Sequence, residues 1–198
     1  MRKHILFILC AALLGAGLAR AQQGRIVFSS DRSGPWRIWI VNADGSGMAE
    51  LAKAEGEFHD VDPTFSPDGK AILFTSTRGG KTGVWRMGGD GSNPTKICDG
   101  DQAEWSPDGA KIVLRRGEAI VIRELSSGKE QTVSPADFPH CSGPSWSPDG
   151  KTIAFACRWE AGNGLFTIPA GGGKPTKVYD KKGACEPHWS PDGKRIVY

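Results

Sequence analysis

Residues 146–151 read Trp-Ser-Pro-Asp-Gly-Lys, and near copies stand at residues 65–70, 105–110 and 189–194. The four motif serines, Ser66, Ser106, Ser147 and Ser190, follow one another at spacings of 40, 41 and 43 residues. A period of this size is typical of a repeat architecture. Within the motif, proline presets φ at the second turn position, and glycine accepts the positive φ that closes a three-residue hairpin loop. Each copy therefore predicts the tip of a β-hairpin.

The residues around each motif predict short strands rather than helices. Runs rich in β-branched and aromatic residues alternate with Gly, Pro, Asn and Asp about every ten residues, and we find no convincing amphipathic helix after residue 21. About four antiparallel strands per 40 residues is the pattern of a β-propeller blade. We therefore predict an all-β propeller of four-stranded antiparallel blades, with about four blades present. The predicted units are blade 1 (24–53), blade 2 (62–98), blade 3 (103–134), blade 4 (144–179) and a partial blade (187–198) within a domain of residues 22–198.

The count of strands leaves two arrangements open. Blade 1 lacks a first strand, and residues 187–198 supply a first strand and most of a second. The strand at 187–190 could complete blade 1 and close a four-bladed ring, but residues 194–198 would then be a surplus strand with an exposed edge. We expect instead a fragment of a six-bladed or larger ring, because the sequence stops at Tyr198 inside a repeat.

Residues 1–21 have the features of a secretory signal peptide. A basic start at Arg2 and Lys3 precedes an apolar run over residues 5–14, and Ala19-Arg20-Ala21 fits a cleavage site. The apolar run is shorter than the roughly 20 residues that a membrane span needs. We therefore expect an exported protein, periplasmic or secreted, with no membrane span after cleavage.

The charge of the chain argues against a nucleic-acid partner. The formal net charge is +3, from 25 basic and 22 acidic residues, and three of the basic residues lie in the predicted signal. Without it the chain has 22 basic and 22 acidic residues and no net charge. No polybasic face or interleaving of aromatic and basic residues is visible.

Four cysteines follow the predicted signal: Cys98, Cys141, Cys157 and Cys185. Export would permit disulfides, and four cysteines allow three connectivities. If Trp146 pairs with Ile153 across the hairpin, Cys141 falls opposite Cys157 or Arg158. A Cys141–Cys157 disulfide and two separate thiols are both open interpretations. Neither a C-x-x-C motif nor a paired Cys/His spacing indicates a bound metal.

Polar residues gather just before each motif, on the strand that lines the central channel of a propeller. If the blades stack, these groups meet at one mouth of the channel, where they could bind a cation, a basic peptide end or a metal. Ordinary solvent-exposed connectors are the other interpretation. The motif aspartates are assigned to the turns. The candidate residues are Asp60, Asp62, Glu104, His140, Glu186 and His188, with His59 and Asp101 beside them.

Nothing in the sequence predicts catalysis. Neither a G-x-S-x-G nucleophile motif nor an H-E-x-x-H zinc signature occurs, and the motif serines are assigned to turns. A catalytic pair of carboxylates that is close in space but distant in sequence leaves no sequence motif. We therefore expect a non-enzymatic protein without a cofactor.

The chain resembles the TolB-like propeller repeat family. The resemblance rests on the four Ser-Pro-Asp-Gly copies, on Phe-Ser-Ser-Asp-Arg at residues 28–32 and on Asn-Ala-Asp-Gly-Ser-Gly at residues 42–47. It implies a β-propeller, commonly six-bladed in TolB, a periplasmic setting and binding of a protein or peptide in the cell envelope. The α/β domain that precedes the TolB propeller has no counterpart between the signal and blade 1. The alternative is the propeller part of a longer prolyl-oligopeptidase-like peptidase, or a hydrolase at the channel mouth.

Overall fold

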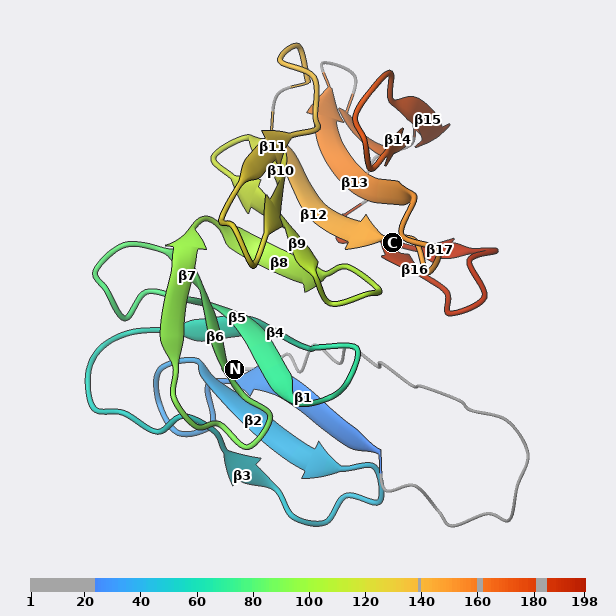
Figure 1. Ribbon diagram of the computed structural model, residues 1–198. Helices are drawn as coiled ribbons and strands as arrows, with labels where there is room; N and C mark the ends of the chain where they lie inside the picture. The colour runs from blue at the N-terminus through green and yellow to red at the C-terminus, as the bar shows by residue number, and fades with distance from the viewer. Residues whose placement is uncertain (1–23, 139, 160–161, 181–184) are drawn as a thin grey trace.

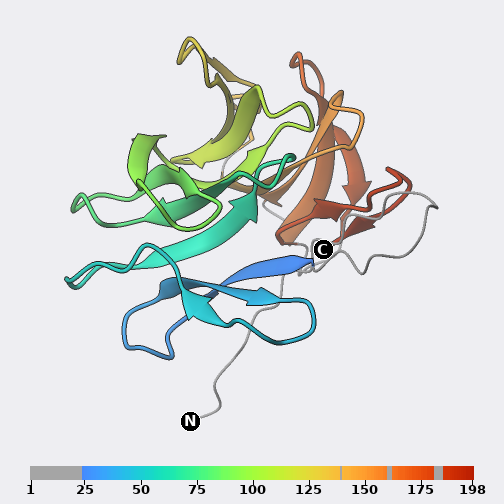
Figure 2. The same cartoon turned by 60° about the horizontal axis from the view of Figure 1, so that its bottom comes forward.

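The computed structural model describes residues 24–138, 140–159, 162–180 and 185–198. The predicted signal peptide lies outside the described residues. Within them the chain forms antiparallel sheets that follow one another around a common centre (Figures 1 and 2). The prediction of an all-β propeller with about four blades is confirmed. None of the described residues belongs to a helix long and apolar enough to cross a membrane.

Each complete blade is a meander whose first strand is innermost. Blade 1 has three strands, blades 2, 3 and 4 have four each, and the partial blade has two. Blade 1 contains β1 (Arg25–Ser30), β2 (Arg37–Asn42) and β3 (Ala49–Glu50), and blade 2 contains β4 (Asp60–Phe65), β5 (Ala71–Ser76), β6 (Gly83–Gly88) and β7 (Thr95–Asp99). Blade 3 contains β8 (Asp101–Trp105), β9 (Lys111–Arg116), β10 (Ala119–Glu124) and β11 (Glu130–Thr132). Blade 4 contains β12 (Cys141–Trp146), β13 (Thr152–Trp159), β14 (Gly162–Pro169) and β15 (Thr176–Tyr179), and the partial blade contains β16 (His188–Trp189) and β17 (Ile196–Val197).

The partial blade does not complete blade 1. Strand β16 pairs with β17 and packs against β12 of blade 4, whereas the sheet of β1 runs in the order β1-β2-β3. The four-bladed closure considered from the sequence is therefore not found among the described strands.

The motif turns are hairpin tips, as predicted, but their loops are one residue longer than expected. In blade 3 the Ser106 amide donates to the Lys111 carbonyl at 2.9 Å, so four residues lie between the closing pair. The Ser106 hydroxyl donates to Asp108 Oδ1 at 2.6 Å and accepts the Lys111 amide at 2.9 Å. The same bonds recur in the other three copies. The extra residue fits because the serine side chain closes the loop in place of a second backbone bond.

The inner strands begin before the predicted positions, at Asp60, Asp101 and Cys141. Each contains a register shift, for example between Val61 and Thr64 in β4. At the shift one residue has positive φ, and the equivalent residue before β16 has it too: Asp62 (53°), Gln102 (50°), Gly143 (57°) and Glu186 (46°). Proline follows three of these four residues. Because proline has no N–H to give to a ladder, a bulge at this point loses little pairing.

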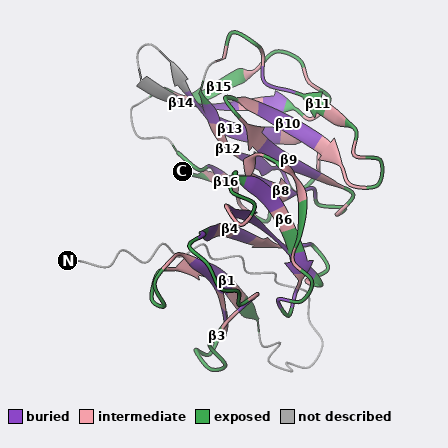
Figure 3. Cartoon of the chain, turned by 90° about the vertical axis from the view of Figure 1, so that its left-hand side faces the viewer, coloured by how far each residue is buried: buried purple, intermediate pink, exposed green. Residues whose placement is uncertain are grey.

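The core lies between neighbouring blades rather than within one. Three clusters of buried apolar side chains fill the spaces between blades 1 and 2, 2 and 3, and 3 and 4. Phe74, Leu114 and Phe155, which occupy equivalent positions in the repeat, are completely buried. Figure 3 shows the buried residues concentrated on the middle strands. Each blade thus depends on its neighbours for its core.

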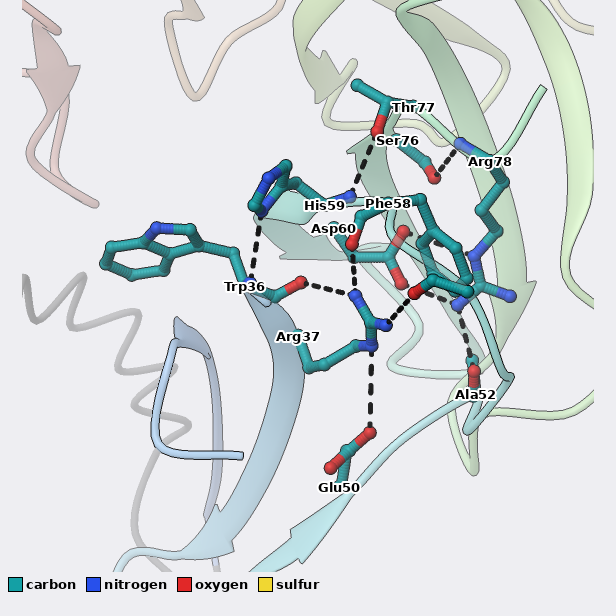
Figure 4. A network of polar contacts seen from close by, with 11 residues as sticks. Trp36, Arg37, Glu50, Ala52, Phe58, His59, Asp60, Ser76, Thr77 and Arg78 are labelled. Atoms are coloured by element: carbon teal, nitrogen blue, oxygen red, sulfur yellow. Dashed lines mark hydrogen bonds and ion pairs between the residues drawn. The ribbon is translucent and has the colours of Figure 1, made fainter. Parts of the chain in front are cut away.

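The connector between blades 1 and 2 is fixed by a polar network (Figure 4). The Phe58 ring lies between the guanidinium groups of Arg37 and Arg78, which are 4.0 and 4.7 Å from its centroid. Arg37 donates to the carbonyl oxygens of Phe58 and Gly56, and Arg78 makes a bidentate ion pair with the buried Asp60. This network fixes the point at which β4 enters the centre of the propeller.

Candidate functional site

The residues with positive φ line up along the centre of the propeller, from one blade to the next. The Gln102 amide donates to Thr75 Oγ1 of blade 2 at 3.1 Å, and the Gly143 amide donates to Gln102 Oε1 at 3.0 Å. Gly143 in turn lies against the backbone of Glu186, where a Cβ atom would stand 2.8 Å from the Glu186 Cα. Neighbouring blades are therefore in direct contact at the bulges.

Acidic side chains from three blades meet at this level. Burial raises the pKa of Asp62, and the nearby charges of Glu186 and Asp101 raise it further. A hydrogen bond with Thr75 and the charge of Arg115 oppose the rise. Since β4, β8 and the segment before β16 contribute these carboxylates, they form the acidic channel mouth, which we define as Asp62, Asp101, Glu104 and Glu186.

Arg115 neutralises part of this charge. Its guanidinium donates to both carboxylate oxygens of its register partner Asp101, at 2.6 Å each. Hydrogen bonding to Asp101 raises the pKa of Arg115, and the charge of Asp62 contributes in the same direction. Among the described residues neither Asp62 nor Glu186 forms an ion pair, so the acidic groups at the mouth outnumber the single guanidinium of Arg115.

Glu104 lies three residues after Asp101 on β8, next to His188. Its Oε1 accepts the Trp146 amide at 3.2 Å, and its buried Oε2 has no hydrogen-bond donor among the described residues. Burial raises the pKa of Glu104 to about 7, against the hydrogen bonds from the Trp146 backbone and the Ser145 side chain. His188 Nδ1 stands 3.9 Å from Oε2, and burial lowers the pKa of His188. Both shifts favour the uncharged forms, a protonated carboxyl beside a neutral imidazole.

Two of the candidates from the sequence do not join the others. Asp60 is completely buried and its carboxylate is engaged by Arg78. His140 makes an exposed pair with Glu118, with 2.9 Å between Nδ1 and Oε1. Asp62, Glu104, Glu186 and His188 are the predicted residues that the fold brings together.

Three polar residues that link the blades at this level, Thr75, Gln102 and Arg115, were not predicted from the sequence. The available signal was a residue followed by proline, which stands four residues before three of the four motif serines, at Asp62, Gly143 and Glu186. This position is the bulge position. In the copy without proline it is occupied by Gln102, four residues before Ser106. No group of three or more metal-ligating side chains suited to a metal ion is found among the described residues.

Comparison with known proteins places this repeat in a family. Residues 20–134 match the TolB beta propeller domain. The chain belongs to the TolB β-propeller family. The matched segment covers more than half of the sequence, and the resemblance seen in the motifs is confirmed.

Solved structures of TolB proteins share the fold. TolB from Acinetobacter baumannii has a TM-score of 0.69 and 22% identity, over 83% of this chain and 43% of that one. A putative TolB from Agrobacterium tumefaciens has a TM-score of 0.72 and 19% identity, over 85% and 67%. An oligogalacturonate lyase in complex with manganese has a TM-score of 0.63 and 17% identity, over 87% and 54%. The TolB-family chain described here therefore spans 43% of the Acinetobacter protein's length, and a propeller of similar fold also occurs in a lyase.

Proposed function

We propose that this TolB-family chain is an exported, non-catalytic propeller scaffold of the periplasm or cell envelope that binds a protein or peptide partner. The observation that carries the proposal is the acidic channel mouth, where carboxylates from several blades meet with one arginine among them. A group of this kind suits a basic segment of a partner, such as a lysine side chain or a free peptide amino terminus. The predicted signal peptide and the family likeness support the setting.

The unpaired Glu104 Oε2 supports the same proposal. A buried acceptor without a donor is costly, and a cationic group of a ligand would supply the missing hydrogen bond. Binding would also return the Glu104 carboxyl to its charged form. Affinity should therefore rise with pH, because the Glu104 carboxyl, with its pKa raised to about 7, is protonated in mildly acidic solution.

The test uses trilysine as the probe and triglutamate as the control peptide, with binding measured by calorimetry on the purified chain. We expect trilysine to bind more tightly at pH 8 than at pH 5, and triglutamate not to bind. Glu186→Gln should weaken binding about tenfold, since a charge-assisted hydrogen bond contributes roughly 1.5–3 kcal/mol. Glu118→Gln is the matched control, because this exposed carboxylate pairs with His140 outside the mouth.

Equal binding of the two peptides, or equal loss in the two variants, would contradict the proposal. If trilysine binds as expected, capture experiments with the immobilised chain and envelope extract would identify the natural partner. A captured partner that trilysine displaces would support the same site.

A second candidate function is hydrolysis at the channel mouth, or a propeller within a longer peptidase. The pair of Glu104 and His188 favours it, because burial raises the pKa of the Glu104 carboxyl to about 7, which suits a general acid at neutral pH, beside an imidazole whose pKa is lowered. Incubation of the chain with a mixture of unblocked peptides, read by mass spectrometry, tests this directly. Cleavage that is abolished by Glu104→Gln would favour the enzyme over the scaffold.

A further inference from the structure

Cys141 in β12 and Cys157 in β13 lie directly opposite each other in the register of blade 4. Their Sγ atoms are 3.2 Å apart, and each residue is 1% exposed. The Cys141 amide donates to the Glu118 carbonyl at 2.9 Å rather than to Cys157. The two cysteines are thus a non-hydrogen-bonded pair, the kind in which facing side chains of antiparallel strands come closest.

We propose that Cys141 and Cys157 form a disulfide that clamps the inner strand of blade 4 to its neighbour. The two sulfurs need to approach by only about 1 Å to reach bonding distance. The pair lies in the apolar cluster between blades 3 and 4, which includes Ile120, Phe155 and Phe166. In this surrounding a thiolate is disfavoured, whereas a disulfide carries no charge and leaves no donor unsatisfied.

In blade 2 the equivalent part of the hairpin is held together by an ion pair instead of a disulfide. Asp60 and Cys141 each stand six residues before their motif serine, and Ser76 and Cys157 each stand ten residues after it. The register pairs Asp60 with Ser76 as it pairs Cys141 with Cys157. Asp60 is held by its bidentate ion pair to Arg78, at the end of the same hairpin.

In blade 3 the corresponding ion pair joins Asp101 and Arg115, one residue closer to the motif turn on each strand than the pair in blade 4. In every complete blade the start of the inner strand is therefore held just before the bulge. An ion pair holds it in blades 2 and 3, and the proposed disulfide holds it in blade 4. In blade 4 this end of β12 leads directly into Gly143, which packs on Glu186 at the acidic channel mouth. A disulfide would hold this part of the mouth in place.

The bond forms by thiol–disulfide exchange with a disulfide oxidant such as oxidised glutathione. One cysteine thiolate attacks the oxidant, forms a mixed disulfide and releases one thiolate. The second cysteine thiolate attacks the protein sulfur of that mixed disulfide and releases the other. The protein loses two protons and two electrons, and the oxidant is reduced to two thiols. Because both sulfurs are buried in the folded chain, we expect oxidation while blade 4 is still open, during folding.

The test uses a chain carrying Cys10→Ser, Cys98→Ser and Cys185→Ser, so that Cys141 and Cys157 are the remaining cysteines. This chain is unfolded in urea and refolded with oxidised glutathione or with dithiothreitol. In the oxidised sample we expect no maleimide labelling after denaturation and a mass lower by two hydrogen atoms. Two labelled thiols and an unchanged mass in the folded, oxidised sample would overturn the proposal.

The clamp is tested by thermal unfolding of the same two samples. Reduction should lower the melting temperature by about 5–10 °C, as expected for a loop of this length in a chain of this size. A chain that also carries Cys141→Ser and Cys157→Ser should melt at the same temperature with and without reductant. If the disulfide forms but reduction leaves the melting temperature unchanged, the clamping role is wrong. The labelling test uses the chain that keeps Cys141 and Cys157, so it remains valid even if the variant that lacks these two cysteines does not fold.

Discussion

At the scale of single residues, Glu104 shows how the fold changes the chemistry of an ordinary side chain. In the sequence it is one acidic residue before a motif. In the structure β12 covers it, so that one oxygen accepts the Trp146 amide and the other is buried without a donor in the described residues. Removal from water favours the protonated form, and this burial is the main reason that the pKa rises to about 7.

Replacing Glu104 with glutamine should therefore stabilise the protein at alkaline pH. The folded-state pKa lies above the ordinary value of 4.5, so the folded chain holds the proton more tightly than the unfolded chain. The stability gained from this proton is complete below pH 4.5 and is lost as the pH rises through about 7. Glu104→Gln avoids the loss, and we expect it to be more stable than the wild type by about 1–3 kcal/mol at pH 8.

Urea unfolding at pH 4.5 and pH 8 measures this difference. At pH 4.5 the variant and the wild type should agree, because the wild-type carboxyl is then protonated when folded. Glu118→Gln, at an exposed position, serves as the matched control and should show no such change with pH. A Glu104→Gln variant that is less stable than the wild type at pH 8 would show that the charged carboxylate is needed for folding.

Asp60 and Asp62 mark the limit of sequence-based prediction at this scale. They are two residues apart and equally polar, and the sequence placed both at the channel mouth. The structure buries Asp60 against Arg78 and brings Asp62 to the mouth. The bulge between Val61 and Thr64 decides which way each side chain points, and it depends on contacts with neighbouring blades. Those contacts are distant in the sequence.

At the scale of elements, the motif hairpin is the part that sequence reasoning predicted best. Proline, aspartate and glycine act locally, so their effect is readable from neighbouring residues alone. The register next to the turn was also predicted, since Trp146 pairs with Ile153. Further from the turn the prediction left Cys157 and Arg158 open as partners of Cys141, and the register shift between Ser142 and Ser145 places Cys157 there. The fourth loop residue was missed, because it depends on the hydroxyl of the motif serine accepting a backbone amide.

The serine hydroxyl should therefore be required for the stability of the turn. Ser106→Ala leaves the Lys111 amide without its acceptor and Asp108 without its main hydrogen bond. We expect a loss of about 1–2 kcal/mol in the free energy of unfolding. The pKa of Asp108, which the Ser106 hydroxyl lowers most, should move up toward its ordinary value.

Two measurements check this, urea unfolding and an NMR titration of the Asp108 carboxyl. Ser33→Ala, at an exposed serine outside the motif, is the control and should change neither quantity. A variant of Ser106 with an unchanged Asp108 pKa would mean that the aspartate is held by the backbone alone.

The connector between blades 1 and 2 gives a second prediction at this scale. Asp60→Ala removes the carboxylate that balances Arg78, whose side chain is 11% exposed. An uncompensated buried charge is strongly unfavourable, and we expect a loss of about 3–5 kcal/mol. Asp60→Ala combined with Arg78→Met should recover part of this loss, because the buried charge is then gone. Equal stability of the single and double variants in urea unfolding would contradict the ion-pair explanation.

At the scale of the whole molecule, the apolar clusters join each blade to the next, so the chain behaves as a stack of coupled units. In such a stack, the strands with neighbours on both sides should open last. Strands β5, β9 and β13 lie within four-stranded sheets and each contains a run of at least three buried residues, whereas β17 is a two-residue edge strand with Val197 at 66% exposure. Local stability should therefore vary from blade to blade.

Hydrogen exchange of the backbone amides tests this gradient. We expect the middle strands β5, β9 and β13 to be protected most strongly, and β3, β16 and β17 to exchange faster by orders of magnitude, because their opening leaves the apolar clusters intact. Exchange of the same peptides in urea supplies the unprotected rates as the control. Uniform protection from β1 to β17 would mean that the chain opens only as one unit, and that the interfaces between blades are stronger than the pairing within the partial blade.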